Sequence, residues 1–170
     1  METEYFKIGK FVSVFGLDGE LILQHSLGKK TSLKGVEAIF IEDSNNSFLP
    51  YFIAAARVKS ETEIYIHLEQ ISIRESARRF VQKEVWLSSE DFKKFAAKSA
   101  PISFLGYHVV DGKTTIGEIT EVIEMPHQVL CKVNMNGVEK LIPLHEQTLE
   151  RVDNKAKKIY VTLPDGLLEI

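Results

Sequence analysis

The sequence is poor in the residues that build disulfide frameworks and membrane spans. It contains a single cysteine, Cys131, so an intrachain disulfide scaffold is excluded. No apolar run approaches the roughly 18 residues of a membrane-spanning helix. The first residues, METEYFK, lack the basic segment and apolar stretch of a signal peptide. We therefore expect a cytoplasmic protein that does not enter a membrane, with Cys131 buried in a strand as a small apolar side chain.

An excess of positive charge is also missing. The chain of 170 residues has 21 Lys and Arg against 24 Asp and Glu, a formal net charge of -3. A protein that coats phosphate backbones through its whole surface is usually strongly basic, so this class is excluded, whereas a local basic patch is compatible with the composition. The length indicates one ordinary domain or two small ones.

Patterns that carry enzyme chemistry are not found. The five histidines show no H-x-H or H-E-x-x-H spacing and no cysteine partners, so no metal site is predicted. The segment GLDGE at residues 16–20 matches neither a Walker loop nor G-x-G-x-x-G, and indicates a tight turn at Asp18-Gly19. We predict a protein without enzymatic activity, metal or cofactor.

The first half of the chain has the period of β-strands. Turn residues separate segments rich in β-branched and aromatic side chains. The polar connector at residues 59–62 predicts an antiparallel hairpin between its two neighbours. The segments expected to be strands are residues 5–15, 19–25, 36–42, 48–58, 63–67 and 85–87.

Residues 72–81 interrupt this rhythm with a helical pattern. Ser72 and Glu75 have the spacing of a capping box, in which two side chains satisfy free amides at a helix start. We therefore expect a short helix with one apolar face. The residues predicted to form that face are Ile73, Ala77, Phe80 and Val81.

The second half also has a β pattern. A small helical turn and then Pro101 favour a linker between two domains. Asn136-Gly137 and Asp111-Gly112 are hairpin signals, because Asn, Asp and Gly tolerate positive φ. The spacing is typical of a small barrel or sandwich. The predicted strands are residues 106–111, 115–124, 128–134, 138–143 and 157–163.

Two groups of basic residues are candidate phosphate contacts. One follows the predicted helix opposite its apolar face, and the other lies in a loop flanked by Gly28 and Gly35. A solvated surface is the competing interpretation of both groups. Few aromatic residues lie near them in the sequence, which argues against sequence-specific binding of single-stranded RNA. The groups are Arg74, Arg78, Arg79 and Lys83, and Lys29, Lys30 and Lys34.

Several motifs occur together in one known order. Residues 6–20, FKIGKFVSVFGLDGE, are similar to a glycine-rich N-terminal signature, with Phe15 in place of the usual His and Asp18 in place of the usual Lys. Residues 66–87, and later FLGYHVVD, IGEITEV, LIPL and LPDGLLE, continue the match. Through these motifs nearly the whole chain resembles the family of the ribosome maturation factor RimM. The signature residues of the turn are Gly16, Leu17, Gly19 and Glu20.

The resemblance implies an all-β protein of two small β-barrels. A six-stranded, translation-factor-like barrel with one short helix is expected at residues 1–92, a linker at 93–101 and a PRC-barrel at 102–170. The implied function is that of a non-enzymatic, monomeric assembly factor that binds the head of the immature small (30S) ribosomal subunit. There it would contact ribosomal protein uS19, the nineteenth of the small-subunit series, and assist maturation of the 3′ domain of 16S rRNA. A generic PRC-barrel adaptor and a small-molecule-binding barrel are the alternatives.

The resemblance also suggests where partners bind. Local rRNA contact is then expected through the two basic groups. From charge sign alone, Glu118, Glu121 and Glu124, expected on the exposed face of one strand, would steer a basic ribosomal protein. Many members have a Tyr-Tyr pair at the positions of Ser99 and Ala100, so that aromatic contact is missing here or shifted to Tyr107. The expected protein-contact residues are Phe104, Leu105, Gly106, Tyr107, Leu141 and Pro143.

Overall fold

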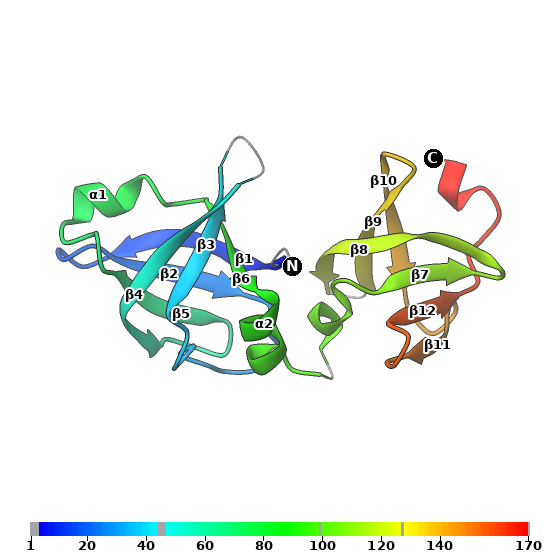
Figure 1. Cartoon of the computed structure of the whole chain (residues 1–170), viewed down its shortest axis with the longest axis horizontal. Helices are drawn as coiled ribbons and strands as arrows, with labels where there is room; N and C mark the ends of the chain where they lie inside the picture. Colours follow the sequence, from blue (N-terminus) through cyan, green and yellow to red (C-terminus); the bar gives the residue numbers. More distant parts are fainter. Residues whose placement is uncertain (1–3, 44–46, 99, 127, 170) are drawn as a thin grey trace. The chain divides into compact units, whose positions relative to one another are not determined.

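The chain divides into two compact units, Met1–Ser103 and Phe104–Ile170. The computed structural model describes residues 4–43, 47–98, 100–126 and 128–169. Each unit contains a six-stranded sheet, which confirms the predicted all-β class (Figure 1). The limits proposed for the linker, residues 93–101, stay a prediction. No helix in the described parts of the chain is long and apolar enough to span a membrane.

The first unit is a closed barrel with the strand order β1-β2-β5-β4-β3-β6. Neighbouring strands are antiparallel, including the hairpin predicted around residues 59–62. The β-forming segments and the turn residues between them thus located every strand of this barrel. The strands are β1 (Tyr5–Phe15), β2 (Glu20–His25), β3 (Ala38–Glu42), β4 (Phe48–Val58), β5 (Glu63–Leu68) and β6 (Glu84–Ser88).

Strand β1 closes the barrel because its two halves pair with different strands. Gly9 belongs to both registers, opposite Val85 of β6 and His25 of β2. Register shifts on either side of Gly9 mark irregularities that let the strand bend. A Cβ on Gly9 would lie 1.8 Å from the backbone O of Gln24, so the close approach of β1 to β2 requires glycine.

Apolar side chains from all parts of the barrel fill its interior. On the paired strands β2 and β5, Leu21, Leu23, Ile64 and Ile66 have no exposed surface. Burial of such side chains is the main favourable term in folding. The interior is therefore a packed core. Further fully or nearly fully buried residues of the barrel are Ile8, Phe11, Ile39, Val85 and Leu87.

The first helix, α1 (Arg74–Arg78), begins differently from the prediction. Ser72 and Glu75 form no capping box, because the N-cap is Ile73 and no side chain caps the helix. Instead the Arg74 N–H donates to the carbonyl of Leu17 in the β1–β2 turn at 3.1 Å. A tertiary partner thus satisfies the amide that the capping box would have satisfied.

The buried face predicted for this helix is only partly correct. Ala77 and Phe80 are buried, whereas Ile73 is 52% exposed. The backbone of Ile73 is extended, so its side chain leaves the helical spacing. The helix then ends at Arg78, after a single turn and a half.

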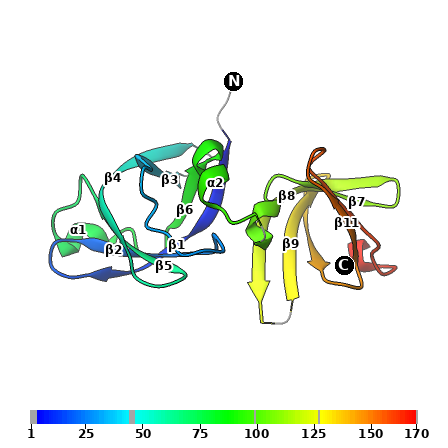
Figure 2. The same ribbon diagram turned by 90° about the horizontal axis from the view of Figure 1, so that it is seen from below.

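A second helix, α2 (Ser89–Phe95), occurs where the sequence indicated a small helical turn. Its N-cap is Ser88, whose Oγ accepts the Asp91 N–H at 3.3 Å. Phe92 is buried, with its ring 5.0 Å from that of Phe6 in β1. The described residues of the first unit therefore contain two short α-helices where one was expected, and they lie at opposite ends of the barrel (Figures 1 and 2).

The second unit is a sheet with the strand order β10-β9-β8-β7-β12-β11. Its neighbours are antiparallel except β7 and β12, which are parallel. Strand β11 was not predicted, because its sequence LERVD is short and largely charged. The strands are β7 (His108–Asp111), β8 (Thr114–Met125), β9 (Gln128–Met135), β10 (Val138–Leu144), β11 (Leu149–Asp153) and β12 (Lys158–Val161). The 3₁₀ helices η1 (Pro101–Phe104) and η2 (Leu167–Glu169) precede and follow them.

Two hairpin turns set the register of this sheet. Asn136 and Gly137 have φ of 53° and 86° between β9 and β10, as a type I′ turn requires. In the other hairpin the connecting residues are Gly112 and Lys113, because Asp111 is still paired within β7. The predicted Asp111-Gly112 turn was therefore wrong by one residue, and only Gly112 has positive φ there.

Cys131 lies in the core of the second unit. Its side chain has no exposed surface, and burial raises the pKa of the thiol to about 12. The prediction of an inward-facing cysteine is confirmed, and its lack of reactivity stays a prediction. Other buried residues of this core are Val109, Ile119, Val133, Ile142, Ile159 and Val161.

Candidate functional site

The turn between β1 and β2 forms an exposed tip at one end of the barrel. Gly16 and Gly19 have φ of 75° and 85°, and Leu17 is 83% exposed. Arg74 Nη1 donates to the carbonyl of Gly16 at 3.0 Å. A Cβ on Gly19 would lie 2.7 Å from the carbonyl O of Ile73, so glycine lets the start of α1 pack on the turn. The signature residues therefore position α1.

Glu20, the last signature residue, orients an arginine on an aromatic pair. Arg57 Nη2 lies 3.3 Å from Glu20 Oε1. The Arg57 guanidinium lies 3.9 Å from the ring centroid of Tyr65 and 5.6 Å from that of Phe15. Sequence reasoning missed this cluster because its members come from four strands, β1, β2, β4 and β5. It also brings two aromatic rings near the turn that anchors α1.

The four basic residues predicted along α1 do not form one helical face. Arg78 and Arg79 are exposed, whereas Arg74 is held by the β1–β2 turn. Lys83 follows a turn in which Gln82 has φ of 75°, so it is not on the helix. A line of four phosphate contacts on one helix is therefore not present.

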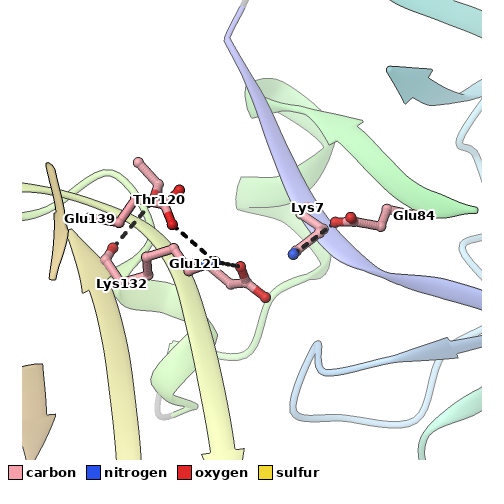
Figure 3. Close-up of polar contacts among 6 residues, drawn as sticks. All are labelled: Lys7, Glu84, Thr120, Glu121, Lys132 and Glu139. Atoms are coloured by element: carbon pink, nitrogen blue, oxygen red, sulfur yellow. Dashed lines mark hydrogen bonds and ion pairs between the residues drawn. The ribbon is translucent and has the colours of Figure 1, made fainter. Parts of the chain in front are cut away.

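Lys83 instead lines a hollow of about 320 Å³ at the start of β6. Three carboxylates share this hollow, and Glu84 Oε2 lies 2.8 Å from Lys7 Nζ (Figure 3). The excess of acidic groups makes the hollow unsuited to phosphate. Its lining residues are Ile41, Glu42, Asp43, Gln82, Lys83, Glu84 and Trp86.

The second basic group lies on a loop with a fixed base. Leu27, Leu33 and Val36 are buried under the loop, and the Val36 N–H donates to the Leu33 carbonyl at 3.0 Å. The charged side chains between them face solvent. This arrangement presents them on a defined backbone, which suits contact with a phosphate backbone. The exposed residues are Lys29, Lys30 and Lys34.

His25 supports the start of this loop. Its side chain is 2% exposed, and Nδ1 accepts the Leu27 N–H at 3.2 Å, which places the proton of the neutral ring on Nε2. Burial lowers the pKa of His25. Nε2 has no hydrogen-bond partner among the described residues. The loop is thus anchored by a neutral, buried imidazole.

Most of the protein-contact residues predicted near the start of the second unit are packed inside it. Leu105 and Tyr107 are 5% and 7% exposed, and the Tyr107 hydroxyl donates to Asn154 Oδ1 at 2.8 Å. Phe104 packs edge-on against Tyr107, with ring centroids 5.6 Å apart. Tyr107 therefore does not offer an exposed aromatic contact.

The two positions aligned with the family's Tyr-Tyr pair, Ser99 and Ala100, show no exposed aromatic contact in the part of the chain that the structure describes. Ala100 is 9% exposed and lies against Gly28, and Ser99 lies outside the described residues. Gly106, the remaining predicted contact of this segment, has φ of 87° and donates its N–H to the carbonyl of Ile119 at 3.0 Å. Its observed role is to connect η1 to the sheet.

Leu141 and Pro143, in contrast, lie on the outer face of β8, β9 and β10. The register places Pro143 opposite Leu130 and Leu130 opposite Ile123, which makes an apolar row across three strands. All three are partly exposed, and Leu141 beside them is 48% exposed. We call Ile123, Leu130, Leu141 and Pro143 the outer row. Ile123 and Leu130 were missed because apolar residues occupy both faces of β8 and β9.

An ion-paired group borders the outer row. Lys132 Nζ lies 3.0 Å from Glu121 Oε2 and 3.8 Å from Glu139 Oε2 (Figure 3). Thr120 Oγ1 also donates to the Lys132 carbonyl at 3.2 Å. Lys132 stands opposite both Glu121 and Leu141 in the ladders, so the charged group directly adjoins the apolar side chains.

The three glutamates expected on one strand face do not all share it. A register shift at Thr120 puts Glu118 and Glu121 on the outer face, although they are three residues apart. Glu124 pairs with Val129, on the same side as the buried Cys131, because no further shift intervenes. The acidic surface is therefore smaller than predicted, and Glu121 is engaged by Lys132.

Comparisons with known proteins cover both units. The sequence model described as the RimM N-terminal domain matches residues 6–92, and that of the RimM PRC barrel domain matches residues 101–167. Within the part of the chain that the structure describes, no three His, Cys, Asp or Glu side chains gather as metal ligands would.

Individual relatives extend over the whole chain. The ribosome maturation factor RimM of Parabacteroides distasonis is 35% identical, and the match covers 99% of this chain and 98% of the relative. The protein of the same name from Bacteroides fragilis is 30% identical, with 98% and 93% covered. A solved structure from Pseudomonas aeruginosa, described as a 16S ribosomal RNA processing protein RimM, is 22% identical, covers 95% of this chain and 98% of that one, and gives a TM-score of 0.42.

Proposed function

The chain belongs to the RimM family, and we propose from this that it assists maturation of the small (30S) ribosomal subunit as a non-enzymatic assembly factor. In this proposal it works in the cytoplasm as a monomer, without metal or cofactor. It binds the head of the immature subunit through ribosomal protein uS19, and it assists maturation of the 3′ domain of 16S rRNA.

The observation that carries the protein contact is the outer row of the second unit. An apolar centre with a charged rim is the composition of many protein interfaces. Here Leu141 is 48% exposed beside the Glu121, Lys132 and Glu139 group. Ribosomal proteins are usually basic, so the carboxylates of this rim complement such a partner and fix its orientation.

The two alternative functions are less well supported. A lone PRC-barrel adaptor would not carry the RimM N-terminal domain, which is matched over residues 6–92. A small-molecule-binding barrel needs an apolar pocket with converging polar groups. The interior of the first barrel is instead filled by side chains such as Leu23 and Ile64, which have no exposed surface.

Sedimentation of cell lysates on sucrose gradients tests the proposed function. We expect the protein to travel with free or immature small subunits and not with translating ribosomes. Cells that lack the protein should accumulate a 16S rRNA precursor. Recovery only from the ribosome-free top fractions, together with normal 16S processing, would contradict the proposal.

Substitution of Leu141 tests the protein contact. Leu141→Asp places a charge in the outer row and should weaken binding to purified uS19 about tenfold or more, measured by calorimetry, since a buried unpaired charge costs at least about 1.4 kcal/mol. Val138→Asp is the matched control, because Val138 is 53% exposed on the same strand but belongs to the opposite face. Equal affinities of the two variants would show that the outer row does not bind uS19.

A further inference from the structure

We propose that the lysines of α2 and of the β2–β3 loop form one surface that binds the phosphate backbone of RNA without reading its bases. This inference rests on the proposed function, since it assigns an RNA contact to a factor acting on 16S rRNA. The lysine surface consists of Lys29, Lys30, Lys34, Lys93, Lys94 and Lys98.

Direct packing brings the two segments together. The Ala97 N–H donates to the carbonyl of Leu27 at 2.8 Å. A Cβ built on Gly28 would lie 2.3 Å from Ala100 Cβ, so only glycine allows the loop to approach the segment after α2 this closely. The loop and the end of α2 are seen side by side in Figures 1 and 2. Lys29 therefore comes directly after the loop residues of this contact, and Lys98 lies between Ala97 and Ala100 on its other side.

The burial pattern of α2 turns its lysines outward. Phe92 and Ala96, four residues apart, are buried against the barrel, as expected for one face of a helix. Lys93 and Lys94 lie between them and are exposed, and Lys98 is exposed just beyond. The helix and the segment just after it thus place three lysines beside the three of the loop, with Glu90 and Asp91 as the acidic residues of the helix.

Most of this charge is not neutralised by neighbours. Lys94 Nζ lies 3.8 Å from Glu90 Oε1, a weak ion pair between exposed groups. The other five lysines make no ion pair within the described ranges of the chain. This contrasts with Lys83, which shares its hollow with three carboxylates. The lysine surface therefore carries more unpaired positive charge than the hollow that Lys83 lines.

The chemistry of the surface favours a phosphate backbone over bases. Lysine ammonium groups on flexible stems contact phosphates as point charges, whereas reading bases requires fork-like donors or stacking rings. Residues 26–37 contain no aromatic side chain, and of the two phenylalanines of α2, Phe92 is buried and Phe95 is half-buried. The partner that fits is a structured RNA recognised by its backbone.

The salt dependence of binding to an RNA duplex of arbitrary sequence tests the inference. We compare Lys29→Gln/Lys30→Gln with Lys93→Gln/Lys98→Gln, and use Lys113→Gln/Lys155→Gln, exposed lysines of the second unit, as the control of equal charge change. Between about 50 and 200 mM salt, each of the first two variants should lower the slope of log K against log salt by about 1.4 to 1.8. The control should keep the wild-type slope.

Other outcomes decide against the inference or against the proposed function separately. An unchanged slope in the Lys93→Gln/Lys98→Gln variant would overturn the shared surface. Loss of binding to phosphatidylserine vesicles in this variant, with duplex binding unchanged, would also overturn it, because the surface would then bind lipid headgroups and not RNA. Suppose that neither variant affects duplex binding but the wild-type protein travels with small subunits. The inference is then wrong, and the proposed function remains intact. Suppose instead that duplex binding depends on both lysine pairs but the wild-type protein is absent from small subunits. The lysine surface is then supported, and the proposed function is contradicted.

Discussion

Replacing Gly9 by alanine should destabilise the first barrel more than a glycine substitution elsewhere on it. Gly9 is the residue at which β1 changes from pairing with β6 to pairing with β2. The new Cβ would lie 1.8 Å from the carbonyl O of Gln24, well inside the 3.0 Å that real Cβ contacts keep. The two strands must therefore separate by about 1 Å, and backbone atoms cannot move aside as a flexible side chain would.

The structure gives the size of this effect. Separation strains the neighbouring ladder, including the Ser26 N–H that donates to the Ile8 carbonyl at 3.0 Å. Loss of about two hydrogen bonds at about 1 kcal/mol each, with overpacking of at least about 1 kcal/mol, gives about 3 kcal/mol. For a unit of this size, that corresponds to a Tm lower by about 12 to 24 °C.

The fluorescence of Trp86 provides the assay. It is the single tryptophan of the chain and lies in β6, next to the Val85 that faces Gly9. Denaturant unfolding followed at this residue reports on the first unit alone. Gly16→Ala is the matched control, because Gly16 has positive φ but no atom within 4 Å of its Cβ position, so only conformational strain of about 1 to 2 kcal/mol is expected. If Gly9→Ala costs no more than Gly16→Ala, the close approach does not constrain the barrel.

Three further predictions concern single side chains. Because burial lowers the pKa of His25, the folded state binds its proton less readily than the unfolded state; the free energy of unfolding should be greatest above pH 6.5 and fall as pH decreases below it. Urea unfolding of His25→Gln should lack this component, and an identical pH dependence would contradict it. The Cys131 thiol, with a pKa of about 12, should resist alkylation by iodoacetamide in the folded protein and react after denaturation, so rapid labelling of native protein would refute its burial. Tyr107→Phe should cost about 1 kcal/mol of stability, measured by thermal unfolding, by removing the hydrogen bond to Asn154, and reduced uS19 affinity at equal stability would show instead that Tyr107 contacts the partner.

The strands could be predicted because their signals are local. Richness in β-forming residues placed β1, and a long apolar run placed β4, at their observed ends, residues 5–15 and 48–58. Asn136-Gly137 gave the β9–β10 turn, since the positive φ of both residues is a property of that dipeptide. Strand β11 was not predicted, because its short charged sequence shows no alternation of apolar and polar residues.

Errors arose where a distant group replaced a local one. The capping box of Ser72 and Glu75 matched its pattern, but the Leu17 carbonyl took the Arg74 amide. The three glutamates of β8 appeared equivalent in sequence, and a register shift at Thr120 separated Glu124 from the other two. Neither the turn that docks on α1 nor the shift can be read from the residues around it.

The candidate surfaces show the same division. The sequence by itself determined the all-β class, the family motifs and the lysines of one loop, because composition, periodicity and motif spacing belong to the chain. Only the tertiary structure decided that the segment of Lys98 packs on that of Lys29 and that Lys83 lies apart from the basic residues of α1. It also decided that Ile123 and Leu130 align with Pro143 across three strands. Such groupings depend on strand register and on contacts between remote segments, which many residues fix together and no short pattern records.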